Sequence, residues 1–535
     1  MMNLSPAHRL SALATMTFAV AVLTPGCSED LCTESDAEAC SGGGGEGGAG
    51  GQGVGGVGGG GAGDATGGGG EGGAAPMPGC LPVEGLEIAA DCGVYVAVGG
   101  GGLGTKTSPF PDLATALDDL AGPANVYVCG APEHLGSVTL PAGVSIVGGL
   151  DCATWVYSVE SPRPSILGDE GIPALTIEGD PLLETSLWSL DIEAPSVTVP
   201  GESSIGVFIR ANATVTMAEV SIVTGDAVAA APPPAMAPQA SPAPSGSNGR
   251  NGGFAPMPVG SGTNTCDGLA LRGGNGGAGG DYNAANPGGG FGADGDSGAG
   301  AIGGAGQNAF NLCFAGTAGS NGAHGAPGSQ QRQWISGTLT EGGWVRADGL
   351  AGGPAAAGSS GGGGGGSRAD VGSTTYGAGG GSGGTAGCGG GGGQGGQAGG
   401  SSIGLASFDA ASVDLGSNVI IRVGAAGSGG AGQIGQPGQD GGAAGLGGNP
   451  NPAQTVAAGC PGGAGGRAGD GGNGAGGDGG SSIGIAHFGE MPTGGVVDLS
   501  SAGVIAAGGP GAAGNNALPG APGRTGVHEE RRQLY

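Results

Sequence analysis

Gly143-Val144-Ser145-Ile146-Val147-Gly148-Gly149 is a short apolar run closed at both ends by glycine. Runs of this length that are rich in β-branched residues and bounded by turn-forming residues are typical of β-strands. Similar runs recur throughout residues 80–226. Short strands that repeat at intervals of about twenty residues predict a solenoid or a β-sandwich. The other runs are 93–98, 126–129, 174–177, 187–192, 196–199, 205–209 and 213–223.

One segment of this region has helical spacing instead. Between Asp112 and Leu120, the apolar residues Leu113, Ala116 and Leu117 recur at the intervals of an α-helix. Gly104-Thr105-Lys106-Thr107-Ser108-Pro109-Phe110 precedes this segment, and Val126-Tyr127-Val128 follows it.

Together with residues 143–149, this order of motifs resembles the opening of right-handed parallel β-helix proteins of the pectin-lyase-like superfold. The resemblance covers residues 93–226 and implies an all-β chain with a right-handed parallel β-helix and a short N-terminal capping helix. The wider chain resembles glycine-rich β-helix lipoproteins of high-G+C bacteria, a group without assigned activity.

An internal repeat extends the β-helix beyond residue 226. Residues 399–408 match residues 479–488 at eight of ten positions, and Ser203-Ser204-Ile205-Gly206-Val207 is a third, partial copy. A strand such as 403–408 cannot bury its apolar side against glycine-rich neighbours, so we expect all three copies to stack in one solenoid. The alternative is a separate C-terminal hairpin domain beyond a disordered linker.

Side-chain alternation predicts which way the repeated residues point. Ile205, Ile403 and Ile483 are expected to face inward, together with the apolar residue two positions after each. The Ser-Ser pairs are expected at one corner, and the glycines of the three copies (Gly206, Gly404 and Gly484) on the outer side.

Glycine supplies 140 of the 535 residues, so large parts of the chain cannot build an ordinary hydrophobic core. We expect the long glycine-rich insertions to form polyproline-II-like strands packed over the scaffold. The boundaries are a signal peptide at 1–26, a glycine-rich tether at 27–79, the β-helix domain at 80–226, an insertion at 227–400, a rung at 401–424, an insertion at 425–480, a rung at 481–507 and a C-terminal tail at 508–535.

The N-terminus predicts export. A positively charged start leads into the apolar run 10–23, which is too short to span a bilayer comfortably. The run ends at Leu23-Thr24-Pro25-Gly26-Cys27, which resembles a bacterial lipoprotein cleavage site, although Thr24 stands where that pattern places Leu. We expect lipidation at Cys27, with ordinary signal-peptide cleavage nearby as the alternative. By resemblance to lipoprotein sorting rules, Ser28 favours the outer membrane.

The chain has 11 cysteines, and removing Cys27 as the lipidated residue leaves ten that can form disulfides in an oxidising compartment. Cys129 and Cys152 are separated by one expected β-helix turn and are predicted to pair between neighbouring rungs. Cys32 with Cys40 and Cys80 with Cys92 are predicted from proximity in sequence. The remaining candidates are Cys266, Cys313, Cys388 and Cys460.

Charge and motifs favour a non-enzymatic protein. A net charge of −29 disfavours nucleic-acid binding. The Gly-x-Ser-x-Gly patterns at 358–362 and 380–384 lack the strand and helix that a nucleophile elbow requires. Residues 289–294 resemble one calcium-binding nonapeptide, but no tandem copy follows, so no metal site or cofactor is predicted. Asp191 and Arg163 are candidate polysaccharide-active residues without evident partners.

Trp334 and Trp344 indicate either the small core of a hairpin or a sugar-stacking platform. The function that this sequence favours is a lipid-anchored, structural or adhesive protein of the cell surface, without catalytic activity. Its expected partners are the membrane, through the lipid, and cell-surface polysaccharide. The alternative is a β-helix carbohydrate-binding module or polysaccharide-active enzyme. One observation separates the two: clustered Asp, Arg or aromatic side chains in a groove on one face of the solenoid.

Overall fold

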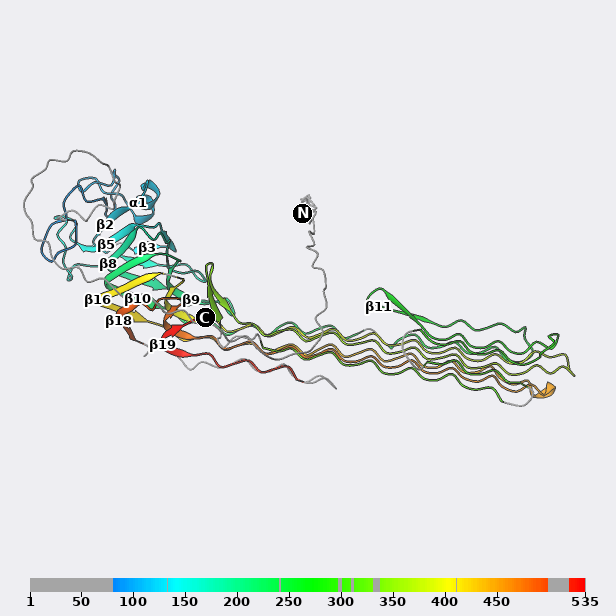
Figure 1. Cartoon of the computed structure of the whole chain (residues 1–535). Helices are drawn as coiled ribbons and strands as arrows, with labels where there is room; N and C mark the ends of the chain where they lie inside the picture. The colour runs from blue at the N-terminus through cyan, green and yellow to red at the C-terminus, as the bar shows by residue number, and fades with distance from the viewer. Residues whose placement is uncertain are drawn as a thin grey trace, which may run out of the picture. The chain divides into compact units, whose positions relative to one another are not determined.

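The computed structural model describes residues 80–131, 133–239, 242–296, 301–308, 312–330, 337–409, 411–498 and 519–534. Two long sheets dominate the β-rich part, and every strand pair in them is parallel. The fold is therefore a parallel β-helix, as the sequence predicts (Figure 1). The capping helix α1 (Leu113–Asp119) is present, and its N-cap Asp112 accepts a 2.7 Å hydrogen bond from the Thr115 N–H.

The first sheet has the order β1-β2-β5-β8-β10-β16-β18, with β3 and β6 beside β8, and the second has the order β19-β17-β15-β9-β7-β4. In the first sheet the strands are β1 (Val94–Val96), β2 (Ala124–Cys129), β3 (Glu133–Leu135), β5 (Val144–Leu150), β6 (Ser165–Leu167), β8 (Glu184–Ala194), β10 (Thr214–Thr224), β16 (Ser412–Arg422) and β18 (Thr493–Asp498). In the second they are β4 (Val138–Leu140), β7 (Leu175–Ile177), β9 (Ser204–Ile209), β15 (Ser402–Ser407), β17 (Ser482–His487) and β19 (His528–Gln533).

The long strands of the first sheet turn a corner at their midpoints. Ser189, Glu219 and Asn418 lie at successive levels of β8, β10 and β16, and their φ angles are +49°, +56° and +54°. Left-handed backbone at non-glycine residues is uncommon, and here it bends each strand at the same place. Before the bend β8 pairs with β5, and after it β8 pairs with β6. The first sheet therefore covers two sides of the β-helix and the second sheet covers the third.

The three Ser-Ser-Ile-Gly copies stack in one sheet, which confirms the single-solenoid prediction. Ile403 is paired with Ile205 on one side and with Ile483 on the other. The Ser-Ser pairs form a ladder at the corner: the Ser203 Oγ accepts from the Ser401 N–H at 2.9 Å, and the Ser401 Oγ accepts from the Ser481 N–H at 3.0 Å. The alternative of a separate hairpin domain is excluded.

The predicted facing of these copies is confirmed for Val207, Leu405 and Ile485, which lie in the main core, and is wrong for the isoleucines and the glycines. A Cβ at Gly206 would lie 2.5 Å from Ile222 Cγ2, so the glycine points into the β-helix and gives room to the opposite strand. The ladder skips this glycine, because Ile205 pairs with Ile403 and the next pair is Val207 with Leu405. This irregularity breaks the two-residue alternation. The isoleucines lie in a second apolar cluster outside the main core.

A hairpin forms part of that second cluster. β13 (Gly337–Thr340) and β14 (Gly343–Arg346) are antiparallel, and Leu339 with Trp344 packs against the isoleucines of the repeat. Trp344 therefore belongs to the small core of a hairpin, which is the first of the two alternatives that the sequence offered for it. Trp334 lies outside the described residues.

The predicted C-terminal tail at 508–535 is also corrected. β19, within this segment, adds a further strand beside β17. Its sequence, His-Glu-Glu-Arg-Arg-Gln, carries no apolar alternation, so it could not be recognised as a strand. Charged residues of this kind are typical of an edge strand, which must avoid pairing with another molecule.

Candidate functional site

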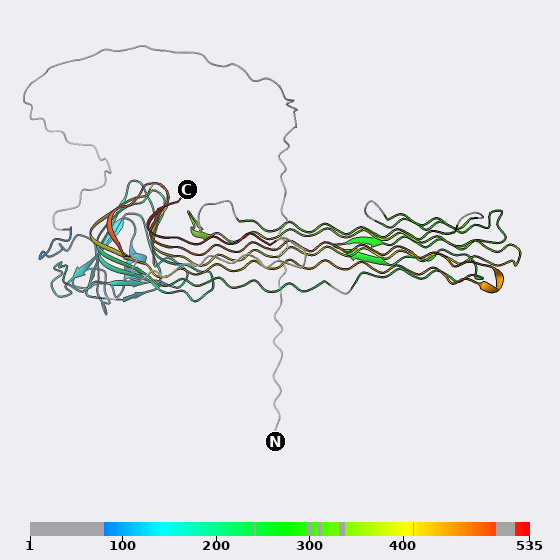
Figure 2. The same cartoon turned by 90° about the horizontal axis from the view of Figure 1, so that it is seen from below.

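The glycine-rich insertions are neither loops nor linkers but an array of extended chains that lie side by side (Figures 1 and 2). Three successive residues of one chain contact three different neighbours. The Gly462 N–H donates to the Gly445 carbonyl at 2.9 Å and the Gly463 N–H to the Gly362 carbonyl at 2.7 Å, while the Ala464 carbonyl accepts from Gly319 at 2.8 Å. This three-residue period is that of a polyproline-II helix, as expected for these segments. The expectation that they pack over the scaffold is wrong, because these chains hydrogen-bond to one another instead.

The array continues the register of the β-helix. In β10 and β16, Thr214 pairs with Ser412 and Val215 with Val413, and further along the same two chains the Ala227 N–H donates to the Ala425 carbonyl at 2.8 Å. A three-fold extended chain rises about 3.1 Å per residue, so the segment from Gly427 to Gly448 is roughly 65 Å long. The array is therefore an outgrowth of the β-helix rungs.

Glycine is required in the array by the close approach of neighbouring backbones. A Cβ at Gly463 would lie 1.9 Å from the Thr317 carbonyl oxygen, and one at Gly465 would lie 1.9 Å from the Thr385 carbonyl oxygen. Because neighbouring backbones surround an inner chain, its buried positions are mostly glycine and alanine, with hydrogen-bonded polar side chains such as Ser382 and Asp470 between them.

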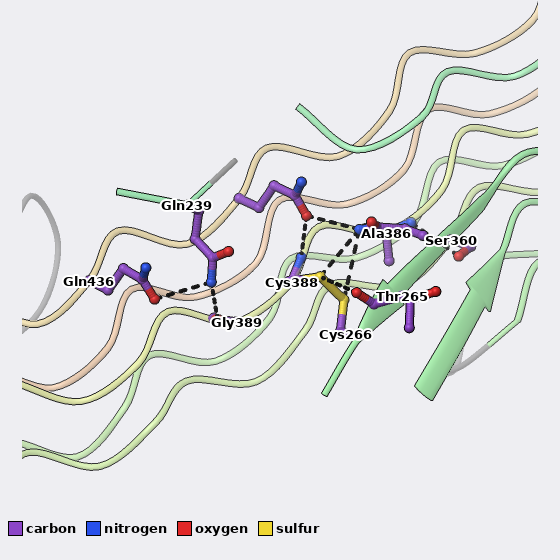
Figure 3. Close-up of a disulfide and its surroundings, with 10 residues drawn as sticks. Gln239, Thr265, Cys266, Ser360, Ala386, Cys388, Gly389 and Gln436 are labelled. Atoms are coloured by element: carbon purple, nitrogen blue, oxygen red, sulfur yellow. Dashed lines mark hydrogen bonds between the residues drawn. A yellow bond between two sulfur atoms is a disulfide. The ribbon is translucent and has the colours of Figure 1, made fainter. Parts of the chain in front are cut away.

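A row of glutamine side chains supplies hydrogen bonds beside a proline-rich chain, which lacks some of its own backbone N–H groups. Residues 232–234 are prolines, which have no N–H to donate. Opposite this stretch, the Gln436 Oε1 accepts from the Gly391 N–H at 3.0 Å, and its Nε2 donates to the Ala237 carbonyl at 2.6 Å. The Gln239 Nε2 also donates to the Gln436 Oε1, at 3.2 Å (Figure 3). Gln433 and Gln439, three residues away on either side, accept in the same way from Gln394 and Cys388.

Four disulfides hold the described residues together. Cys80–Cys92 and Cys129–Cys152 are the two pairs predicted for this region, and Cys129–Cys152 joins neighbouring rungs with Cα atoms 5.0 Å apart. The other two pairs, Cys266–Cys388 and Cys313–Cys460, lie in the array (Figure 3 shows the first). Cys27, Cys32 and Cys40 lie outside the described residues. Disulfides in this number are typical of an exported protein.

Four loops meet at one end of the array, and we call them the tip loops: 251–257, 281–287, 369–376 and 449–457. Their contacts tie them together. The Gly253 N–H donates to the Tyr376 carbonyl at 2.9 Å, and the Thr455 Oγ1 donates to Asp370 Oδ2 at 2.5 Å. The rings of Tyr282 and Tyr376 have centroids 4.7 Å apart.

The tip loops bring polar and aromatic side chains together at one end of the glycine-rich array. Hydrogen bonds from Thr455 and Ser373 hold the pKa of the Asp370 carboxyl below its usual value, so this group is ionised at neutral pH. A hydrogen bond with Tyr282 raises the pKa of the Tyr376 hydroxyl. A groove with a volume of about 390 Å³ lies beside Asp370 and Thr455. In ligand pockets, a few convergent polar groups of this kind fix the orientation of what is bound.

The polysaccharide-active candidates on the β-helix are brought together, with a third residue that sequence reasoning missed. Arg163 donates to Glu219 Oε2 at 3.1 Å and to the Glu219 carbonyl at 2.8 Å, and Asn418 donates to the other carboxylate oxygen of Glu219 at 2.7 Å. Burial raises the pKa of Asp191, and Arg163 opposes that rise. Both carboxylate oxygens of Glu219 therefore accept hydrogen bonds that stabilise the bends of the strands. No sequence signal marks Glu219, because its role depends on the left-handed bend.

The other candidates lie apart. In the segment 289–294, which resembles a calcium-binding nonapeptide, Asp294 Oδ1 accepts from the Gly303 N–H at 2.8 Å and so joins two chains of the array. Of the histidines, His487 is buried in β17 and His324 accepts from the Asp470 N–H at 3.0 Å. Within the described residues, no three His, Cys, Asp or Glu side chains gather as metal ligands, and no helix is long and apolar enough to cross a membrane.

No family model, curated protein or solved structure matches this chain. The functional assignment therefore depends on the geometry of the molecule: a parallel β-helix, an array that grows out of its rungs, and the tip loops at the end of that array.

Proposed function

We propose that this chain is an exported, lipid-anchored surface protein that acts as a structural or adhesive element rather than as an enzyme. The β-helix is the base, the glycine-rich array is a stiff spacer, and the tip loops make the contact. The observation that carries this proposal is the unbroken three-residue hydrogen-bond ladder between the β-helix rungs and the tip loops. A flexible linker between the β-helix and the tip loops would not require such a hydrogen-bond ladder.

Two further features support the assignment to the outside of the cell. Four disulfides are useful only in an oxidising compartment. The apolar run 10–23, followed by Cys27, supplies an export signal and an acylation site. Several acyl chains on one cysteine would anchor the protein stably, because two membrane-binding signals hold more firmly than one.

The second candidate function is that of a carbohydrate-binding module or of a polysaccharide-active enzyme. The polar groove beside the tip loops favours the binding module. The Arg163–Glu219–Asn418 cluster supports the enzyme less well, because acid–base catalysis needs a carboxylate that can reach substrate and Glu219 has an exposed fraction of only 8%.

Display at the surface can be tested with an epitope inserted after Asn283, which is exposed in a tip loop. We expect an antibody to label intact cells that export the tagged chain, and Cys27→Ser to release the chain from the membrane fraction. An epitope that is reached only after the cells are lysed would contradict surface display. Retention of the Cys27→Ser chain in the membrane would contradict the anchor.

Attachment can be tested on the same cells. We expect the double variant Tyr282→Ser/Tyr376→Ser to reduce attachment to polysaccharide-coated surfaces severalfold. The control is Leu182→Ser on the β-helix, where the side chain is 89% exposed. Equal attachment by both variants would remove the adhesive role from the tip loops.

A further inference from the structure

The groove at the tip loops has walls from three separate segments of the chain. One wall is Gln307 and Asn308, the second is the segment 368–372, and the third comes from Thr455 and Ala457. Amide, guanidinium, carboxylate and hydroxyl groups therefore surround one space of about 390 Å³. These are the groups that orient small polar ligands.

Hydrogen bonds fix the walls relative to one another. The Arg368 N–H donates to Gln307 Oε1 at 3.0 Å, which joins the first wall to the second. The Thr455 Oγ1 donates to Asp370 Oδ2, which joins the third wall to the second. Thr374 and Thr455 have φ angles of +53° and +58°. Left-handed backbone at two threonines costs about 1–3 kcal/mol each, and strain of this kind gathers at ligand-binding sites.

Among the residues that line this groove, Arg368 carries the only positive charge and Asp370 the only negative one. Elsewhere in the described residues, arginines such as Arg163, Arg467 and Arg524 pair with carboxylates at 2.6–3.2 Å. Among the described residues, Arg368 has no carboxylate within 4.0 Å, although acidic residues outnumber basic ones by 43 to 14. Arg250 and Arg272 also lack such a partner there, but of these three arginines only Arg368 lines the groove. An arginine left without an acid in an acidic protein is suited to an anionic group of a ligand, which it can bind through two parallel hydrogen bonds.

We propose that this groove binds an acidic saccharide, with the sugar carboxylate on Arg368 and the sugar hydroxyls on Asp370, Asn308 and Gln307. The inference rests on the proposed adhesive function and names its ligand class. Asp370 accepts hydrogen bonds from hydroxyl groups, and the amides both donate and accept. A sugar that carries hydroxyls and a carboxylate on one ring matches this set, whereas a purely neutral sugar leaves Arg368 unpaired.

The test is titration calorimetry on the whole, disulfide-bonded protein. The probes are oligomers of galacturonic acid and of guluronic acid, and the same oligomers after reduction of their carboxyl groups. We expect at least one acidic oligomer to bind and its reduced form to bind at least tenfold more weakly. Because the ion pair is partly open to solvent, binding should weaken further in high salt.

The matched variants are Arg368→Gln and Arg250→Gln, which change the net charge equally. Arg250 lies near the same end of the array, where its carbonyl accepts from Gly379, and its side chain is exposed. We expect Arg368→Gln to weaken binding of the acidic oligomer at least tenfold and Arg250→Gln to leave it unchanged. Both variants should keep the thermal midpoint of the parent.

Three results would overturn the inference: no binding of either acidic oligomer, equal binding of the reduced oligomers, or equal losses in the two arginine variants. These results leave the adhesive function standing if the Tyr282→Ser/Tyr376→Ser chain still attaches poorly. Conversely, the chain could bind the acidic oligomer through Arg368 in calorimetry and yet not be displayed on cells. That result would support the binding inference and contradict the adhesive function.

Discussion

At the residue scale, the inner glycines of the array are defined by contact rather than by flexibility. A Cβ at Gly363 would lie 1.9 Å from the Asn275 carbonyl oxygen, whereas one at Gly260 would have no atom within 4 Å. We therefore expect Gly363→Ala to lower the free energy of unfolding by about 1–3 kcal/mol, the usual cost of overpacking, with Gly260→Ala near neutral. Thermal or denaturant unfolding measures both, and equal effects would show that the chains are not closely packed.

The glutamine row gives a second prediction at this scale. Replacing Gln436 by leucine leaves the Gly391 N–H without its 3.0 Å acceptor. An unsatisfied buried donor costs about 1–3 kcal/mol, and Gly391 is half-buried, so Gln436→Leu should lower the denaturant midpoint by an amount near the lower end of that range. Gln397→Leu is the control, because that side chain is exposed on a neighbouring chain. A Gln436→Leu chain as stable as the control would contradict the role given to this row.

At this scale, contacts that follow from regular spacing could be predicted from the sequence, and contacts that follow from local irregularities of the backbone could not. The spacing of Cys129 and Cys152 was sufficient to identify their disulfide, because one β-helix turn separates them. The orientation of Gly206 was not predictable, because it depends on a break in strand alternation opposite Ile222. The contacts of Glu219 were not predictable either, because they depend on a left-handed backbone bend that most non-glycine residues avoid.

At the scale of an element, the array chain that ends at Ser481 contains two buried aspartates with opposite pKa shifts. For Asp470, burial favours the neutral form, but hydrogen bonds from Gly438 and Arg467 outweigh it and lower the pKa. For Asp478, burial dominates and raises the pKa despite Arg524. Asp478 also accepts from the Arg524 N–H at 2.8 Å and so holds the segment that leads to β19.

The two shifts predict opposite pH effects. A lowered pKa means that ionised Asp470 stabilises the fold above its unfolded pKa, near 3.8, and that this stabilisation is lost as the pH falls through the lower folded pKa. A raised pKa means that Asp478 stabilises the fold when protonated, and that this is lost as the pH rises through the folded pKa.

We therefore expect Asp470→Asn to lower the thermal midpoint at pH 7 and to have a smaller effect at pH 2.5, below the unfolded pKa. Asp478→Asn should be neutral or stabilising at pH 7, because it removes a costly buried charge and keeps an acceptor for Arg524. Thermal unfolding at both pH values measures this, and equal losses for the two variants at pH 7 would contradict it.

Elements with side-chain periodicity were predicted well, and those without it were not. The capping helix and the Ser-Ser-Ile-Gly strands carry apolar spacing that the sequence displays. The order of neighbours in the array is set by backbone hydrogen bonds between residues far apart, such as Gly316 with Pro461. Glycine has no side chain to record such a pairing, so only the extended conformation could be predicted.

At the scale of the whole molecule, the central claim is that the described residues of 227–400 and 425–480 are an ordered extension of the β-helix. The same three-residue ladder joins chains that leave neighbouring rungs, and the Cys266–Cys388 and Cys313–Cys460 disulfides join chains inside the array. A glycine-rich linker of the same composition would instead behave as a random coil. The stiffness of this spacer is what makes the tip loops a defined surface.

The most direct measurement is native-state hydrogen exchange of the backbone amides in the whole, disulfide-bonded chain. Amides of inner chains, such as Gly381, Gly384 and Gly463, donate at 2.7–2.9 Å to carbonyls of other chains. We predict that they exchange as slowly as the strand amides of β10 and β16, since both belong to one cooperative unit. Exchange of these glycines at the rates of an unfolded peptide, while the β-helix strands remain protected, would contradict the account.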